Sequence, residues 1–449
     1  MLSKFFNYSG RYGAFAEKLI KLRRDIYTRS RSSSLRIGFQ SAIELGELYR
    51  RRAEYKESST VYTTLLLNPF FESVDHSLRI KLFSNLSELN ISLGNISAAK
   101  EYLDQARTIG ASSEKCDWYF LAELDAQKAW LYFIEEKFTE GEKILNSVIS
   151  NVVHRIGKNA PLAGTALNNL ALILYNNCKF KEAGKILESI LIDDECSFGE
   201  NNFNTILDRI NLGWVREALG NLGFSRKSYN RAWLAARDSL GASHPSTLLA
   251  LSSISWINVV LHGGNAKRIA QSALSRCEKI LGKSHADTIT PRRAVVWSLI
   301  YSNDHHGARQ LASLNEKVAS DCFGDGHSNY AACLFDSACT YEAQEKKSFC
   351  LANQALEVIL QSLGEHHLDA AIAINALGVS AAMSGNFKGA LNAFERASSI
   401  QAAILTEGHT DRLTVNKNLR ILRMSSSRIK LNKLSRFMAV RRYLPSSTM

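Results

Sequence analysis

Proline is scarce in this sequence, with 5 residues in 449. Because proline breaks helix interiors, so few prolines, widely dispersed, favour an all-helical protein. No apolar run approaches the roughly 18 residues that a membrane-spanning helix needs, and no short apolar stretch with a small-residue cleavage site follows Met1. We therefore expect neither a membrane protein nor a secreted one, and a cytoplasmic location.

Sequence patterns that carry catalysis or bind metal are also missing. The eight cysteines include no Cys-x-x-Cys pair, and neither G-x-S-x-G nor H-E-x-x-H occurs. Gly282-Lys283-Ser284 imitates the end of a phosphate-binding loop, but Cys277 stands where that loop requires glycine. We predict a non-enzyme with no cofactor and no metal, whose cysteines are buried thiols in a reducing compartment.

Negative charge is absent from one end of the chain. Residues 412–449 hold ten Lys or Arg and no acid, and residues 1–38 hold nine Lys or Arg and two acids. The residues between them carry more acids than bases. Any attraction to nucleic acid or to an anionic membrane should therefore come from the ends.

What the sequence does contain is a repeated pair of amphipathic segments. Within residues 371–397, Leu377-Gly378 lies in one apolar-periodic segment, a turn follows at Gly385, and Phe394 lies on the apolar face of a second segment. Neither helix of such a pair can cover the shared apolar face alone, so the pair must stack on neighbours like itself.

Equivalents of the Leu377 position, called here the marker position, recur upstream at steps of 40–42 residues. The marker residues are Leu45, Leu86, Lys128, Leu170, Leu212, Ile254, Val295, Ser337 and Leu377. This spacing predicts nine repeats.

A second series joins the repeats, as in LGASHP from Leu240 and LGKSHA from Leu281. Its glycine suits a left-handed helix C-cap, and the polar residues that follow suit the next helix N-terminus. We interpret the histidines of these links, such as His244 and His285, as capping residues.

The Leu-Gly, Gly-x-Phe and Ala-x3-Phe pattern resembles a tetratricopeptide repeat. With the LG-x-x-HP link and the LNNLA of residues 167–171, it is similar to the 42-residue repeats of kinesin light chains, over about residues 39–420. The resemblance implies an all-α, right-handed α-solenoid of about nine helix-turn-helix repeats with a C-terminal capping helix, acting in protein–protein interaction. No sustained heptad segment precedes the repeats, so a motor-cargo role is not expected.

We divide the chain into four parts. Residues 1–38 form a basic N-terminal helix and linker, 39–409 the solenoid, 410–424 the capping helix and 425–449 a basic amphipathic tail. The N-terminal part is also rich in Arg and Ser, which leaves a transit-like organellar segment as an alternative to the cytoplasm.

Four tryptophans occur two residues after the marker: Trp130, Trp214, Trp256 and Trp297. In tetratricopeptide repeats the first helices line the concave surface, so the resemblance implies an aromatic stripe in the groove that could anchor a peptide. The alternative is that these rings pack between neighbouring first helices.

Asparagines gather just before the marker, where amides could hold the backbone of an extended peptide. They are Asn168, Asn169, Asn211 and Asn375. The alternative is hydrogen bonding between helices of the wall.

The basic tail offers further contacts through Arg428, Lys430, Lys433, Arg436, Arg441 and Arg442. These residues are either a solvated arm, or a surface for anionic membrane or nucleic acid.

The sequence thus predicts a scaffold or adaptor that binds a peptide segment of another protein in its groove. The alternative is a regulator whose basic ends contact nucleic acid or membrane while the solenoid senses a partner.

Overall fold

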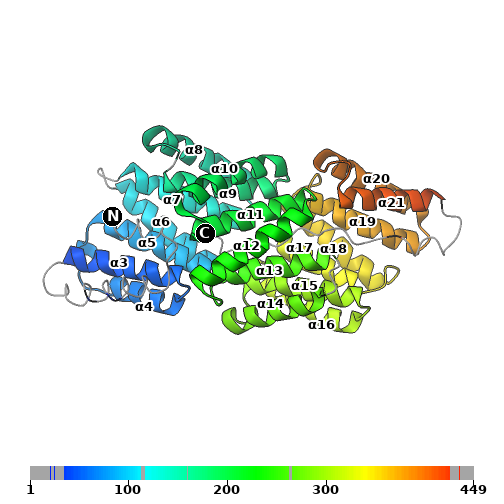
Figure 1. The fold of residues 1–449 in the computed structure, drawn as a ribbon, viewed down its shortest axis with the longest axis horizontal. Coiled ribbons are helices and arrows are strands. Elements are labelled where there is room, and N and C mark those ends of the chain that lie inside the picture. The colour runs from blue at the N-terminus through cyan, green and yellow to red at the C-terminus, as the bar shows by residue number, and fades with distance from the viewer. Residues whose placement is uncertain are drawn as a thin grey trace.

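The computed structural model describes residues 35–112, 117–158, 160–261 and 265–424, together with Lys21, Asp25 and Leu434. Within these residues the chain forms nine helical hairpins and one further helix, with no strand, which confirms the all-α solenoid. Figure 1 shows the hairpins following one another along the molecule, from α3 and α4 at one end to α20 and α21 at the other.

The hairpins are α3 (Leu35–Arg51) with α4 (Tyr55–Leu66), α5 (His76–Ser92) with α6 (Ile96–Ser112), α7 (Trp118–Ile134) with α8 (Phe138–Ile156), α9 (Pro161–Asn176) with α10 (Phe180–Phe198), α11 (Phe203–Ala218) with α12 (Leu222–Leu240), α13 (Pro245–Val260) with α14 (Ala266–Leu281), α15 (Ile289–Tyr301) with α16 (His305–Phe323), α17 (Ser328–Cys339) with α18 (Lys346–Ser362), and α19 (Leu368–Met383) with α20 (Phe387–Ile404). Two short 3-10 helices, η1 (Phe71–Ser73) and η2 (Ala286–Thr288), lie before α5 and α15. The last helix, α21 (Thr410–Met424), packs on α19 and α20, where the sequence predicts a capping helix.

The Leu-Gly signature marks the closest approach of the two helices in a hairpin. A Cβ atom added to Gly213 would lie 2.4 Å from the ring of Tyr229, and one added to Gly378 would lie 2.7 Å from the ring of Phe394. Both rings are fully buried. Glycine is therefore required where an aromatic ring of the second helix rests directly on the backbone of the first.

In most of the described hairpins, the turn contains a residue with positive φ. Gly385 supplies it at +86°, whereas Cys178 and Glu136 adopt φ of 59° in the same turn. A non-glycine residue in this region costs roughly 1–2 kcal/mol, which the packing of the long hairpins outweighs.

The link glycines adopt a different conformation from the one predicted. Gly241 has φ 96° and ψ 159°, and Gly282 has φ 92° and ψ 155°. These angles lie in the extended, positive-φ region that only glycine adopts readily. The prediction of a left-handed C-cap was therefore correct in the sign of φ but wrong in ψ. The conformation directs the chain away from one hairpin and into the next.

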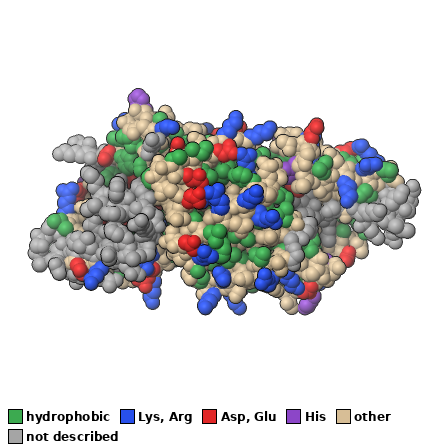
Figure 2. All heavy atoms as spheres, in the orientation of Figure 1, with side chains coloured by type: hydrophobic (Ala, Val, Ile, Leu, Met, Phe, Trp, Pro, Cys, Tyr) green, Lys and Arg blue, Asp and Glu red, His purple; other side chains and the backbone are tan. Residues whose placement is uncertain are grey.

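First helices of neighbouring repeats contact one another along the solenoid. We call the layer formed by these first helices, which are the odd-numbered helices from α3 to α21, the first-helix wall. Its side chains contribute to the apolar core, whose two large clusters lie over roughly the first half of the chain and from Trp256 to Leu422. The second helices expose much of their surface. Figure 2 shows Lys and Arg side chains scattered over one face of the molecule, with fewer Asp and Glu among them.

The thiols are only in part buried as predicted. Cys277, Cys333 and Cys339 are buried, but Cys196 and Cys350 are exposed on second helices. Exposed positions on these helices face solvent rather than a neighbouring repeat, so a small apolar residue is not required there.

The link histidines do more than cap helices. Nδ1 of His244 accepts a hydrogen bond from the backbone N–H of Ser246 at 3.2 Å, as a cap should. Nε2 then donates to the backbone carbonyl of Arg51 at 2.9 Å, 193 residues earlier. The neutral imidazole with its proton on Nε2 makes both bonds.

The same long-range bond recurs along the chain. Nε2 of His327 donates to the carbonyl of Ile134 at 3.0 Å, and Nε2 of His367 donates to that of Asn176 at 2.8 Å. The separations are 193 and 191 residues, or about four and a half repeats. The solenoid is therefore coiled tightly enough that these three links contact the C-terminal ends of first helices in the preceding superhelical turn.

The buried histidines make this coiling sensitive to acid. Burial lowers the pKa of His244 and of His409 below the usual value for histidine. The unfolded chain therefore takes up protons at higher pH than the folded chain does, so this contribution to stability is complete above about pH 6.5 and is lost as the pH falls further.

We expect the replacement His244→Asn to lower the free energy of unfolding by about 1 kcal/mol. Asparagine can still cap α13, but it is too short to reach the carbonyl of Arg51. Thermal unfolding between pH 7.5 and 5 should also show a shallower loss of stability than in the unmodified chain. The exposed His154 provides the control: if His154→Gln changes the pH profile as much as His244→Asn, the contact between turns is not the cause.

Candidate ligand-binding site

The four predicted tryptophan anchors are buried. Trp130, Trp214, Trp256 and Trp297 lie on α7, α11, α13 and α15, with 0–2% of their surface exposed. A ring with so little exposed surface offers nothing for a peptide to contact. The structure therefore corrects this prediction in favour of the alternative, in which the rings pack inside the first-helix wall.

Two of these rings also join neighbouring repeats by hydrogen bonds. Trp214 Nε1 donates to Ser253 Oγ at 3.2 Å, and Trp297 Nε1 donates to Asp336 Oδ1 at 2.9 Å. In each pair the acceptor lies 39 residues later, on the next first helix. The polar end of the indole thus serves the wall and not a ligand.

Asp336 is also paired with Arg293, and both side chains are about 1% exposed. The Arg293 guanidinium lies 5.4 Å from the centre of the Trp256 ring. This buried cluster explains how repeats seven and eight accommodate buried charged residues, because each charge has a partner.

The predicted asparagine clamps are likewise part of the wall. Asn211 Nδ2 donates to Asn168 Oδ1 at 2.9 Å, between α11 and α9. Asn418 Nδ2 donates in the same way to Asn375 Oδ1 at 2.9 Å, between α21 and α19. The prediction that Asn211 and Asn375 clamp a peptide is therefore wrong, because both side chains are fully buried and form hydrogen bonds between helices.

We predict that Trp256→Ala destabilises the protein by about 3–5 kcal/mol, the range for removal of a large aromatic side chain from a core. The denaturant midpoint measured by circular dichroism should fall well below that of the unmodified chain. A loss of less than about 1 kcal/mol would mean that the ring is not a core residue. Trp256→Phe, which keeps an aromatic ring, should lose much less.

Asn168 and Asn169 border a cavity of about 410 Å³ between α9, α10 and α11, a volume within the range of ligand pockets. The part of α9 that lines it contains Gly164, where an added Cβ would have no neighbour within 4 Å. The exposed residues Pro161, Thr165 and Ser189 stand at its edge. The cavity is therefore open to solvent.

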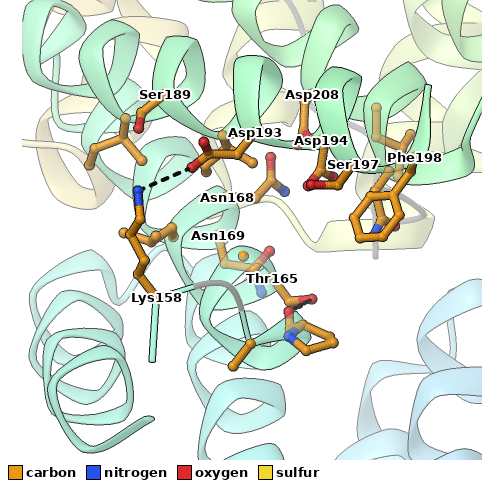
Figure 3. A pocket seen from close by; sticks show the side chains of 18 of the residues that line it. Lys158, Thr165, Asn168, Asn169, Ser189, Asp193, Asp194, Ser197, Phe198 and Asp208 are labelled. Carbon is orange, nitrogen blue, oxygen red and sulfur yellow. Dashed lines mark hydrogen bonds and ion pairs between the residues drawn. The ribbon is translucent and has the colours of Figure 1, made fainter. Parts of the chain in front are cut away.

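Apolar and charged side chains line different parts of this cavity. The apolar part comes from Ile186, Ile190, Leu207 and Phe198, among others. The charged residues are Lys158, Lys185, Asp193, Asp194 and Asp208. Figure 3 shows Asp194 and Asp208 next to one another, with Asn168 between them and Asp193 in this view.

Asp194 and Asp208 interact directly as a carboxyl pair. Burial raises the pKa of Asp208 well above its usual range, and the nearby Asp194 raises it further. Burial also raises the pKa of Asp194 to about 6, against the lowering effect of its hydrogen bond with Asp208. Burial and the neighbouring carboxylate thus both favour the protonated form of Asp208, in which it can donate a hydrogen bond to the Asp194 carboxylate.

Buried polar atoms without partners add to the cavity's polar side. Oδ2 of Asp208 and Nδ2 of Asn169 are both buried, and neither has a hydrogen-bond partner. Such groups cost free energy unless they are satisfied. Paired carboxyls also occur in acid–base catalysis, but there both groups touch the substrate, whereas Asp208 is 4% exposed.

Asn168 and Asn169 were found in the sequence, while Asp194, Asp208 and Gly164 were missed. A signal for Asp208 was available, because it lies four residues before the marker Leu212. The other eight repeats have an uncharged residue there, such as Leu124, Ala250 or Ala373. An acid at one copy of an otherwise uncharged core position marks this repeat as different.

The predicted basic tail contacts Arg428, Lys430, Lys433, Arg436, Arg441 and Arg442 lie outside the described residues. In that tail the structure describes Leu434, which is partly buried against the second core cluster. Over the described part of the chain, no group of three or more His, Cys, Asp or Glu is arranged to hold a metal ion, and no helix is both long and apolar enough to cross a membrane.

The hairpins, their glycine–aromatic contacts and the stacked first helices define a tetratricopeptide-type α-solenoid. Its repeats are similar to those of kinesin light chains. The chain is 25% identical over 213 residues to Protein KINESIN LIGHT CHAIN-RELATED 3 of Arabidopsis thaliana. That match covers 46% of this chain and 32% of the plant protein, so the chain spans about a third of the relative. No family model matches the sequence.

Solved structures share the fold over most of the chain. The apo form of the quorum sensor NprR from B. thuringiensis is similar with a TM-score of 0.53 and 13% identity, over 82% of this chain and all of that one. A Rap protein complexed with competence and sporulation factor is similar with a TM-score of 0.51 and 11% identity, over 87% of this chain and 94% of that one. These likenesses establish the fold.

Proposed function

We propose that this chain is a non-catalytic interaction scaffold that binds a peptide segment of a partner protein, and that the cavity between α9, α10 and α11 holds part of that peptide. The observation that carries the proposal is the cavity itself. It opens between three helices of two neighbouring repeats, and its lining includes buried polar atoms without partners.

The fold comparisons agree with a peptide ligand. A Rap regulator of the plasmid pLS20, similar to this chain with a TM-score of 0.51 and 12% identity, was solved in complex with a Phr* peptide. The match covers 78% of this chain and 98% of the Rap regulator. Solenoids of this kind can therefore hold a peptide, and we extend that capacity to the present chain.

The cavity's chemistry also suits a peptide. Its apolar side can bury side-chain methylene groups, and the unpartnered Nδ2 of Asn169 can donate to a backbone carbonyl once a ligand is present. Thr165 and Ser189 place hydroxyl groups at the edge, where flanking peptide groups would pass.

To test this, peptides enriched from a random phage-displayed library on the full chain would be measured by fluorescence anisotropy. We expect Gly164→Phe to weaken their binding at least about tenfold. The ring would fill the cavity and exclude peptide side chains whose burial contributes about 1.4 kcal/mol or more to the binding free energy. Gly164 is helical and has room for the ring, so the fold should be retained.

Gly223→Phe is the matched control, because Gly223 is exposed on α12 and an added Cβ there also has no neighbour within 4 Å. This variant should bind like the unmodified chain. Failure to enrich any peptide, or equal binding by Gly164→Phe, would contradict the proposal.

A further inference from the structure

We infer that the cavity is built for a cationic side chain, so that the bound peptide presents an arginine or lysine to Asp194 and Asp208. This inference rests on the proposed function and specifies its ligand. It is carried by the cavity's unbalanced charges and by the buried carboxyl oxygen of Asp208 that lacks a partner.

The cations already near the cavity do not neutralise the carboxyl pair. Lys158 lies 4.0 Å from Asp193, and both side chains are more than half exposed, so that contact is weak. Lys185 is exposed on α10. Among the described residues, no ion pair is formed by Asp194 or Asp208.

Arg209, the neighbour of Asp208 in sequence, is also committed elsewhere. Its guanidinium is 3% exposed and pairs with Glu195, with Glu200 at 4.0 Å. The protein thus places a buried arginine within one residue of the carboxyl pair but turns it towards other acids. The pair is left to share a proton instead.

A cationic group complements this carboxyl pair better than a neutral group does. Buried carboxylates are stabilised when they accept hydrogen bonds from a cationic donor, and Asp194 is partly exposed, so a ligand can reach it. Asp208 lies behind it and keeps Asp194 in place through their shared hydrogen bond.

The remaining surfaces match the rest of such a side chain. Arginine and lysine carry a stem of three or four methylene groups below the charge. Ile186, Ile190 and Leu207 line the apolar side of the cavity, where that stem can be buried while the head reaches Asp194.

The charge on Asp194 gives the binding a definite pH dependence. Its pKa is raised to about 6 by burial and by the charge of Asp193, and Asp208, Lys158 and Lys185 are the other charged groups of the cavity. A cation favours the ionised carboxylate, so affinity should be nearly constant above pH 7 and should fall as the pH drops through 6.

The experiment uses the full chain and labelled pentapeptide pools with a fixed central residue and random flanks. The central residue is arginine, lysine, citrulline or leucine; citrulline has nearly the shape of arginine without its charge. We expect the arginine pool to bind about tenfold or more tightly than the citrulline pool, as a charge-assisted hydrogen bond implies.

Asp194→Asn should remove the preference for arginine over citrulline and also the pH dependence. Since burial disfavours the charged form of Asp194, a neutral asparagine should leave the fold intact. Asp104→Asn, at an exposed site on α6 away from the cavity, should change neither property.

The outcomes separate this inference from the proposed function. If all pools bind alike and Gly164→Phe abolishes their binding, the cavity holds peptides but not through a cation, and the inference is wrong. If the arginine preference survives Asp194→Asn, the cation binds elsewhere and the inference is again wrong. If no pool binds, both fail.

Discussion

The structure depends on one constraint: each helical hairpin can bury its apolar face only against the next hairpin. The close contact inside a hairpin, where Tyr229 rests on Gly213 and Phe394 on Gly378, sets the distance between its helices. The repeat length of about 42 residues then fixes how successive hairpins rotate. As a result, His244, His327 and His367 each reach a carbonyl one superhelical turn earlier.

This coiling determines what a ligand can contact. With successive turns in contact and first helices packed together, side chains that would line an open groove are enclosed in the wall. The four tryptophans pack there, and two of them bond to the following repeat. The cavity beside Asp194 differs from the rest of the wall because Gly164 leaves space and Asp208 places a carboxyl group at a position that is Ala or another residue without a carboxyl group in the other repeats.

Much of the fold could be predicted from the sequence, since the marker position recurs nine times at steps of 40–42 residues and the pattern around it is local. The tryptophan stripe could not be assigned, because a periodic position tells which face of a helix a ring occupies but not how closely the first helix of the next repeat covers it. Asn211 and Asn375 were misassigned for the same reason: their hydrogen-bond partners lie 43 residues away, in the neighbouring repeat. The link histidines were assigned correctly as caps, but their second bond spans more than 190 residues, and no local pattern encodes it.

The contact between successive superhelical turns is the claim on which this account rests. It can be tested by measuring the distance between spin labels on noncanonical residues at Lys56 and Ser243, two exposed positions near the carbonyl of Arg51 and the ring of His244. We predict a single short distance at pH 7.5 that lengthens or broadens on acidification. A long or broad distance at pH 7.5 would show an open solenoid and would contradict the packed wall described above.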